Sequence, residues 1–387
     1  MPSKFCRMPY EAVAISSIGK IMPCCAFDNA KAGNHKTISE YWESDLRKEV
    51  IKSFDNNLQH PGCRSCWEQE DSGTRSKREK YSLNNTKLPF TTKNISPKFV
   101  ELALGNQCNV ACVTCGSDFS TGWRQYDKQM PEMFADRKDL LKVNFKVDRP
   151  FIDDLLSKMK TNPSLKIELI GGEPFFNREG VYLLEQMAKH NMPNEVAMTS
   201  NCTIITDSIV DVVKKLNVHI CPSIDAVGPM YSYIRNYDFN TVEQNLMKLK
   251  DAGIQLIIMP VFSVFNVWQI PNLLKWLLSK DWDTLRTKIK LNNFVHGPDY
   301  CSIKNIPHEL LRDTINEIKE IDISTFCTHE DKLSFINSLT NYTQQDKEKD
   351  LKRTLGWIKQ CNKIRGVNIQ DLDEDMELYM EYLENGI

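Results

Sequence analysis

VELALGNQCNVACVTCGS, residues 100–117, is the stretch that decides the fold, because it joins a short apolar run to three closely spaced cysteines. The VELAL run predicts a buried β-strand. Residues 105–115 then form a loop at the carboxyl end of that strand, where α/β barrels place their active sites. Cys108, Cys112 and Cys115 have the spacing C-x3-C-x2-C. Three thiolates are one ligand fewer than a tetrahedral zinc site or an electron-transfer iron–sulfur cluster uses, so the spacing favours a cluster with one open iron.

Two other interpretations of the same spacing remain open. A zinc knuckle would take a fourth ligand from elsewhere in the chain, and a loop of buried thiols would bind no metal. The next segment favours the cluster, because residues 167–170 predict a second strand that leads into the sequence Gly-Gly-Glu-Pro at residues 171–174. Two glycines let the backbone approach a ligand closely, and the Glu173 carboxylate can accept hydrogen bonds from an ammonium group.

The cysteine triad followed by Gly-Gly-Glu-Pro resembles the signature of the radical S-adenosylmethionine (SAM) superfamily. The resemblance implies that Cys108, Cys112 and Cys115 bind a 4Fe–4S cluster whose fourth iron coordinates SAM. It also implies that the strand ends at residues 195–201 and 219–225 contact SAM, and that an arginine pairs with the SAM carboxylate. The cofactor-binding residues implied in this way are Gly171, Gly172, Glu173, Pro174, Thr199, Asn201, Ser223, Asp225 and Arg235. The chain departs from the family pattern at Thr114, Cys202 and Ala226.

A second group of cysteines lies within the first 66 residues. Cys6 precedes an alternating apolar run that turns at Gly19 and ends at Cys24 and Cys25. This run predicts a β-hairpin that brings Cys24 back beside Cys6.

A helix is predicted next, over residues 39–54, with Ser39 as its N-cap. This helix would bring Cys63 and Cys66 round to complete a cage of four thiolates with Cys6 and Cys24.

The cage resembles the "twitch" half of a SPASM domain, which holds an auxiliary iron–sulfur cluster in many peptide-modifying and dehydrogenating radical SAM enzymes. In most of those enzymes the module follows the barrel, whereas here it precedes it. The hairpin pattern Gly-x-x-x-Pro-Cys favours Cys24 over Cys25 as the ligand, and either residue remains possible. Zinc is the alternative metal, since thiolates alone do not distinguish zinc from iron. A second 4Fe–4S cluster is expected, because the triad already commits the protein to cluster assembly.

Composition excludes several classes of protein. The 387 residues carry 41% hydrophobic and 26% charged residues, as in soluble globular proteins. A net charge of −2 gives no basic field for nucleic acid or anionic lipid. The longest apolar stretch, residues 254–278, is interrupted by Pro, Asn, Gln and Lys, so a strand and a helix explain it better than a membrane span. Thirteen cysteines in a long chain with no apparent signal peptide predict a reduced, cytoplasmic protein.

The fold class predicted is α/β: a partial (β/α)6 TIM-like barrel of the radical SAM type, a small N-terminal α+β cluster-binding domain and a helical C-terminal extension. The predicted domains are residues 1–92, 93–300 and 301–387. An insertion after the triad carries Trp123, Met130 and Phe134, which are expected to pack in the core rather than line a substrate cavity. The lone cysteines are likewise expected to be small core residues.

The resemblance implies reductive cleavage of SAM to a 5′-deoxyadenosyl radical that abstracts hydrogen from a substrate. A peptide or protein side chain is the expected substrate, with oxidation or a crosslink as the outcome, and an external electron donor such as flavodoxin or ferredoxin. Oxidation of a carbohydrate-like alcohol is the alternative reaction. A non-catalytic metal-binding or redox-sensing scaffold is the alternative from another class, and it leaves residues 171–173 unexplained. The sequence predicts neither a catalytic side chain nor an oligomeric state.

Overall fold

The structure is a computed structural model that describes residues 4–71, 76–84, 96–295, 297–344 and 350–385. The chain divides into two compact units. Unit 1 contains residues 1–107, 143–199 and 211–218, and unit 2 contains residues 108–142, 200–210 and 219–387. The boundary predicted between residues 92 and 93 lies outside the described residues.

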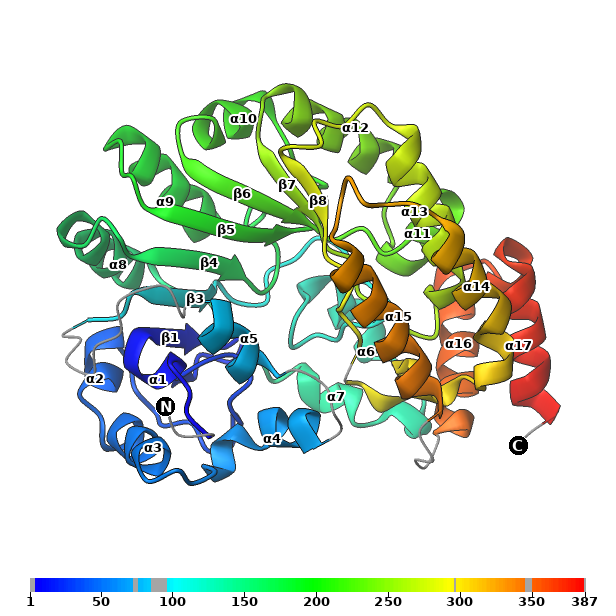
Figure 1. Ribbon diagram of the computed structural model, residues 1–387, viewed down its shortest axis with the longest axis horizontal. Helices are drawn as coiled ribbons and strands as arrows, with labels where there is room; N and C mark the ends of the chain where they lie inside the picture. The colour runs from blue at the N-terminus through cyan, green and yellow to red at the C-terminus, as the bar shows by residue number, and fades with distance from the viewer. Residues whose placement is uncertain (1–3, 72–75, 85–95, 296, 345–349, 386–387) are drawn as a thin grey trace. The chain divides into compact units, whose positions relative to one another are not determined.

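Five strands form the sheet of unit 1, in the order β2-β1-β3-β4-β5 (Figure 1). Their bounds are β1 Ala12–Ile15, β2 Ile21–Met22, β3 Phe99–Ala103, β4 Lys166–Ile170 and β5 Glu195–Ser200. The first two strands form the predicted hairpin, which is antiparallel with Ala14 opposite Met22. Gly19 lies in the turn at a φ of +80°, a value that glycine adopts without strain. The hairpin prediction is therefore confirmed.

The first hairpin strand also belongs to the parallel part of the sheet. β1 pairs in parallel with β3, from Ala12 opposite Phe99 to Ile15 opposite Leu102. β3 pairs in the same sense with β4, and β4 with β5. In β4 the residues Ile167 and Leu169 are buried and alternate with the partly exposed Glu168 and Ile170, as the pleat requires. The front hairpin thus extends the sheet instead of forming one of its own.

The helices of unit 1 are α1 Met8–Glu11, α2 Ile38–Trp42, α3 Asp45–Asp55, α4 Arg64–Asp71, α5 Lys77–Asn84, α8 Arg149–Thr161 and α9 Arg178–Lys189. The prediction of one helix over residues 39–54 with Ser39 as N-cap is wrong. Thr37 caps α2 by accepting a hydrogen bond from the Glu40 amide, and Ser44 caps α3 by accepting one from the Arg47 amide. Each Ser or Thr stands three residues before the amide that it binds, which is the spacing that starts a helix. Two helices, α2 and α3, each with its own N-cap, therefore replace the single predicted helix.

Unit 2 holds the strands β6 Asn217–Pro222, β7 Gln255–Ile258 and β8 Thr287–Ile289, in that order, with parallel pairing of β6 to β7 and of β7 to β8. The first two residues of β6 belong to unit 1. Its helices are α6 Arg124–Asp127, α7 Arg137–Leu140, α11 Gly228–Arg235, α12 Phe239–Asp251, α13 Ile270–Ser279, α14 Arg312–Glu320, α15 His329–Gln344, α16 Leu351–Arg365 and α17 Glu374–Asn385, and α10 Asp207–Val213 spans the two units. Helices α14, α15, α16 and α17 form the helical C-terminal extension (Figure 1).

The α/β class is confirmed, because parallel strands alternate with helices from β3 to β8. The strands predicted at residues 100–104 and 167–170 are present as β3 and β4, and those predicted to end near residues 200 and 224 are present as β5 and β6. Trp123, Met130 and Phe134 are buried, as predicted for the insertion. Of the lone cysteines, Cys202, Cys221, Cys301 and Cys361 are buried and Cys327 is half-buried.

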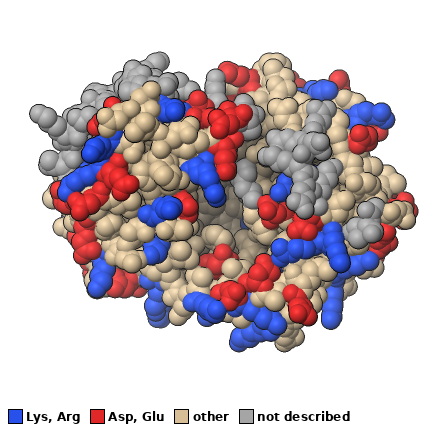
Figure 2. Space-filling view, turned by 90° about the horizontal axis from the view of Figure 1, so that it is seen from below, with Lys and Arg blue, Asp and Glu red and all other residues tan. Residues whose placement is uncertain are grey.

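None of the described helices is long and apolar enough to span a bilayer. On the face drawn in Figure 2, basic and acidic side chains are interspersed, in agreement with the net charge of −2.

Candidate functional site: two sets of cysteines

The triad cysteines of unit 2 lie together on one irregular loop. Cys108 and Cys112 are buried with Val110 in one apolar cluster, against which the half-buried Cys115 packs. The Cys115 amide donates to the Cys112 carbonyl at 3.0 Å and closes a tight turn between these two cysteines. The three cysteines therefore pack in one cluster on a short loop.

Polar side chains approach two of the three sulfurs. The Arg235 guanidinium donates to Cys112 Sγ at 3.6 Å, and the Asn201 amide donates to Cys108 Sγ at 3.8 Å. The pKa of Cys112 is lowered, because the Cys115 thiol donates a hydrogen bond to it and because Arg235 lies beside it, and the same hydrogen bond raises the pKa of Cys115. Both effects favour a thiolate at Cys112, and the thiolate is the form that binds iron.

Four of the residues that the resemblance assigns to SAM make contacts of their own within unit 2. Arg235 Nε lies 2.6 Å from Asp225 Oδ2, and both side chains are nearly buried. The other oxygen of Asp225 accepts the Val261 amide at 2.8 Å. Asn201 Oδ1 accepts the Thr203 hydroxyl at 2.7 Å. Ser223 is buried, and its amide donates to the Ser200 carbonyl at 2.9 Å.

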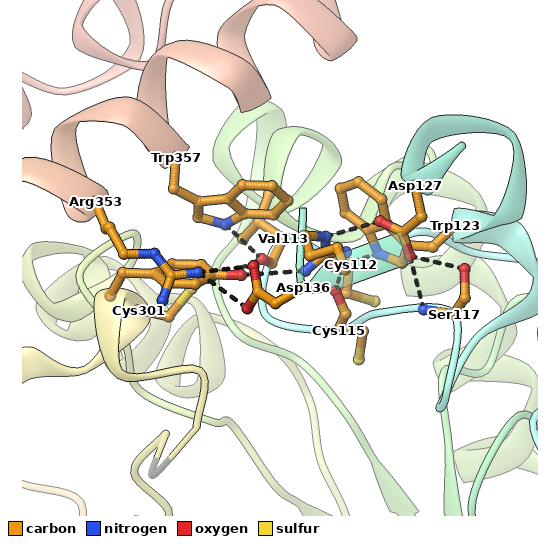
Figure 3. Close-up of polar contacts among 12 residues, drawn as sticks. Cys112, Val113, Cys115, Ser117, Trp123, Asp127, Asp136, Cys301, Arg353 and Trp357 are labelled. Atoms are coloured by element: carbon orange, nitrogen blue, oxygen red, sulfur yellow. Dashed lines mark hydrogen bonds and ion pairs between the residues drawn. The ribbon is translucent and has the colours of Figure 1, made fainter. Parts of the chain in front are cut away.

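Side chains from other segments hold the backbone of the triad loop (Figure 3). Trp123 Nε1 donates to the Cys112 carbonyl at 2.8 Å, and Trp357 Nε1 donates to the Val113 carbonyl at 2.9 Å. Arg137 Nη2 donates to the Cys115 carbonyl at 2.9 Å.

Arg137 is itself fixed by a buried ion pair. Its Nε lies 2.7 Å from Asp127 Oδ1, and the second Asp127 oxygen accepts the Ser117 amide and hydroxyl. The guanidinium also stacks on the rings of Trp123 and Trp357, with its central carbon 4.6 and 4.3 Å from the two ring centres. Cation–π contacts of this kind are strongest where water is excluded.

The Gly-Gly-Glu-Pro element lies at the end of β4 in unit 1, where the sequence predicts it. Gly171 and Gly172 have φ values of +74° and +59°. A Cβ on Gly172 would lie 2.3 Å from the Gln107 carbonyl oxygen, so only glycine fits there. The Glu173 side chain is buried and accepts the Phe175 amide at 3.1 Å. Thr199 lies near the end of β5, half-buried.

The four front cysteines of unit 1 line one small cavity. Cys6, Cys24, Cys63 and Cys66 surround it together with Met8, Ala26, Phe27, Phe54 and Arg78. Burial raises the pKa values of Cys6, Cys24 and Cys63, and the charges of neighbouring thiolates raise them further. A bound cationic metal centre would remove this cost, because it deprotonates its thiol ligands. Four thiols around an apolar cavity therefore fit an iron–sulfur cluster chemically.

Local packing brings the two halves of this cage together. The Asp28 amide donates to the Gly62 carbonyl at 2.8 Å, and a Cβ on Gly62 would lie 2.2 Å from the Phe27 ring. Arg78 donates to the Phe5 carbonyl at 2.7 Å and lies 4.8 Å from the centre of the Trp67 ring. These contacts fix the residues that neighbour Cys6, Cys24, Cys63 and Cys66 in the chain.

Cys25 lies outside the cavity, on the exposed side of the hairpin end. Lys77 Nζ donates to Cys25 Sγ at 2.7 Å and lies 2.6 Å from the buried carboxylate of Glu101. Among the residues that the structure describes, no group of three or more His, Cys, Asp or Glu side chains is arranged so that it could hold a metal ion. The structure thus places Cys24 with the other three thiols and Cys25 apart from them.

Sequence reasoning missed the side chains that hold the triad loop. Arg137, Trp357 and Arg365 lie 22 or more residues from the carbonyls that they bind. The sequence indicated only that such donors are needed, because a buried loop without regular backbone hydrogen bonds requires side chains to bind its carbonyls. The sequence does not say which residues supply them.

Comparison with known families identifies both cysteine regions. The family model "Radical SAM superfamily" matches residues 102–277, which include the triad and the Gly-Gly-Glu-Pro element. The family model SPASM, described as an iron–sulfur cluster-binding domain, matches residues 6–67, which include the four front cysteines.

Two curated relatives match about half of the chain. The uncharacterized protein MJ0907 of Methanocaldococcus jannaschii is 24% identical over 205 residues, which are 50% of this chain and 64% of the relative. A GTP 3′,8-cyclase of Rhizobium etli is 24% identical over 194 residues, which are 48% of this chain and 49% of the relative. The chain thus spans between 49% and 64% of the length of these relatives.

Solved structures also match, with low scores. Streptococcus suis SuiB bound to S-adenosylmethionine has a TM-score of 0.41 at 12% identity, over 72% of this chain and 59% of that chain. SuiB bound to precursor peptide SuiA has a TM-score of 0.35 at 13% identity, over 60% of this chain and 49% of that chain. The protein anSMEcpe with bound AdoMet has a TM-score of 0.41 at 14% identity, over 58% of this chain and 59% of that chain.

The protein is thus of the class in which a parallel α/β fold carries iron–sulfur clusters on cysteine-rich loops. It carries a radical SAM domain over residues 102–277 and, ahead of it, a SPASM-type iron–sulfur cluster-binding domain over residues 6–67. These two domains imply two 4Fe–4S clusters, one that binds SAM and one that is auxiliary.

Proposed function

We propose that this protein is a radical SAM enzyme that acts on a peptide or protein side chain, with oxidation or a crosslink as the outcome. Cys108, Cys112 and Cys115 hold the SAM-binding cluster, and Cys6, Cys24, Cys63 and Cys66 hold the auxiliary cluster. The residues proposed for SAM are those at 171–174, together with Thr199, Asn201, Ser223, Asp225 and Arg235. The proposed domains are residues 1–92, 93–300 and 301–387.

One observation carries the proposal. The three triad thiols lie on a single buried loop, and hydrogen-bond donors approach Cys108 Sγ and Cys112 Sγ at 3.8 and 3.6 Å. Donors of this kind stabilise the negative charge of thiolates and of the cluster that they bind. Cys108, Cys112 and Cys115 would hold the cluster, which would supply the electron for reductive cleavage of SAM.

The protein's own residues have three tasks. The thiols hold iron, the glycines at 171 and 172 leave room for a ligand beside the backbone, and apolar side chains exclude water. The peptide substrate is supported by the resemblance of the hairpin and its cysteines to twitch modules of peptide-modifying enzymes. Reduced thiols in both sets suit a reducing compartment such as the cytoplasm.

The test is SAM cleavage by anaerobically purified protein. With dithionite or reduced flavodoxin, the wild-type protein should release 5′-deoxyadenosine, measured by mass spectrometry. Cys112→Ala should abolish the release, whereas Cys327→Ala, a change at a half-buried cysteine outside both sets, should preserve it. No deoxyadenosine from the fully iron-loaded wild type would instead support the scaffold alternative.

The substrate class needs a separate measurement. Short peptides encoded beside the gene for this chain should lose two hydrogen masses, or form a crosslink, when incubated with the reduced enzyme and SAM. Cys63→Ala should spare SAM cleavage and stop this mass change. Conversion of a sugar alcohol to a carbonyl, with no change in the peptides, would favour the carbohydrate alternative.

A further inference from the structure

Six backbone carbonyls of the triad loop accept hydrogen bonds from side chains. Thr121 binds the carbonyl of Cys108, Ser120 that of Val110, Arg365 that of Ala111, Trp123 that of Cys112, Trp357 that of Val113 and Arg137 that of Cys115. Buried backbone carbonyls need hydrogen-bond partners, and in this loop side chains supply them. The loop backbone is held in one orientation.

The orientation of each carbonyl fixes the amide on the other side of the same peptide. In a trans peptide, the C=O of one residue and the N–H of the next point in opposite directions. Capture of the Ala111, Val113 and Cys115 carbonyls therefore turns the amides of Cys112, Thr114 and Gly116 away from the donors. Within the part of the chain that the structure describes, none of these three amides has a hydrogen-bond acceptor.

The Cys115 thiol lies away from two of the side chains that bind the loop carbonyls. In Figure 3 the Cys115 side chain points away from Trp357 and Trp123. Backbone amides next to cysteine ligands are the groups that donate N–H···S hydrogen bonds to iron–sulfur clusters, and such bonds raise the reduction potential by stabilising added negative charge.

Two of the three side chains that bind the Ala111, Val113 and Cys115 carbonyls come from the C-terminal extension. Trp357 and Arg365 lie on α16, beyond the residues that match the radical SAM family model. Trp357 is fully buried, and its ring packs against Trp123, Phe134 and Tyr300 with ring centres 5.2 to 5.5 Å apart. Arg365 is held by a second bond, from its Nε to the Tyr233 carbonyl at 2.8 Å.

We propose that Trp357, Arg365 and Arg137 are positioning residues that aim the amides of Cys112, Thr114 and Gly116 at the triad cluster and thereby set its reduction potential. The C-terminal extension is then part of the redox machinery and not only a cover. The inference rests on the proposed function, because it requires a cluster on the triad.

The test removes one N–H and keeps an aromatic side chain at the position. Trp357→Phe deletes the bond to the Val113 carbonyl. Trp268→Phe is the matched control, because Trp268 is also a buried indole, donates to the Leu310 carbonyl at 3.0 Å and packs against Tyr379. Full-length proteins are loaded with iron anaerobically, and the triad cluster is followed by electron paramagnetic resonance during a redox titration. The paramagnetic resonance signal of the triad cluster is told apart from that of the auxiliary cluster because it changes when SAM is added.

Trp357→Phe should retain the wild-type iron content and show a midpoint potential more negative than that of wild type, while Trp268→Phe leaves the potential unchanged. Trp123→Phe should produce a smaller shift, because the amide opposite its carbonyl, that of Val113, is already bound to the Ile234 carbonyl at 2.9 Å. Arg365→Lys is the second variant if Trp357→Phe does not fold, and it should shift the potential in the same direction.

An unchanged potential in Trp357→Phe overturns the inference, as does an equal shift in Trp268→Phe. Loss of triad iron without any shift in the remaining clusters also overturns it, because the role is then only structural. A wild-type protein that shows no SAM-sensitive cluster signal overturns the proposed function itself. Normal SAM cleavage with an unshifted potential in both variants overturns this inference alone.

Discussion

At the scale of single residues, the choice between Cys24 and Cys25 is decided by which side of the hairpin end each thiol occupies. Cys24 lines the front cavity, whereas Cys25 contacts Lys77 outside it. Cys24→Ala should therefore lose the iron of the auxiliary cluster, and Cys25→Ala should keep it. Iron and acid-labile sulfide per chain measure both variants, and equal losses would show that the second thiol also serves as a ligand.

The ion pair of Asp127 with Arg137 gives a prediction about stability. Both side chains are buried, and removing one partner of such a pair leaves the other charge without compensation. Asp127→Asn should lower the free energy of unfolding by about 3–5 kcal/mol.

The control for this variant is Asp139→Asn, because Asp139 pairs with Lys142 on the exposed surface. Exposed pairs contribute about 0–1 kcal/mol, so this variant should unfold almost as the wild type does. Denaturant titration measures the free energy of unfolding of both variants. If they lost equal stability, the buried pair would have no special role in holding the triad loop.

The helices of the front module show at the scale of elements what a sequence reveals. The hairpin was predictable because Gly19 and the alternating apolar residues both specify it. The break between α2 and α3 was not, because residues 39–54 contain nothing that interrupts a helix as strongly as proline. Ser44 starts the second helix only because the preceding backbone is extended, with a ψ of 155° at Ser44. An extended backbone is ordinary at an N-cap, and residue identity alone does not say which Ser or Thr adopts it.

The two serines give a direct test. Ser44→Ala removes the N-cap of α3 and should lower the free energy of unfolding by about 1 kcal/mol. Ser39→Ala, at the position where sequence alone places the cap, should change it by less than about 0.5 kcal/mol. Thermal or denaturant unfolding measures both. A larger loss from Ser39→Ala would contradict the two-helix arrangement.

The same contrast holds for the candidate sites. Spacing alone located both sets of cysteines and the Gly-Gly-Glu-Pro element, because these residues are close together in the chain. The contacts of Arg365 with Ala111 and of Trp357 with Val113 join segments more than 240 residues apart. Periodicity and motif spacing carry no information over such separations, so these contacts required the structure.

At the scale of the whole molecule, the front module shares its sheet with the barrel strands. β1 pairs along its full length with β3, which lies beyond the predicted boundary at residue 92. A fragment of residues 1–84 would therefore expose a bare strand edge, which favours association with other chains. We expect this fragment to aggregate or to lack stable secondary structure, measured by circular dichroism and size-exclusion chromatography. A monomeric, folded fragment would show that the module is autonomous.

The pairing of β1 with β3 also orders events during synthesis. The hairpin and the four front cysteines leave the ribosome before residues 99–103, because they lie earlier in the chain. During that interval the nascent chain has one strand edge without its partner. We expect slower elongation through residues 67–99 to lengthen this interval and to lower the yield of folded protein.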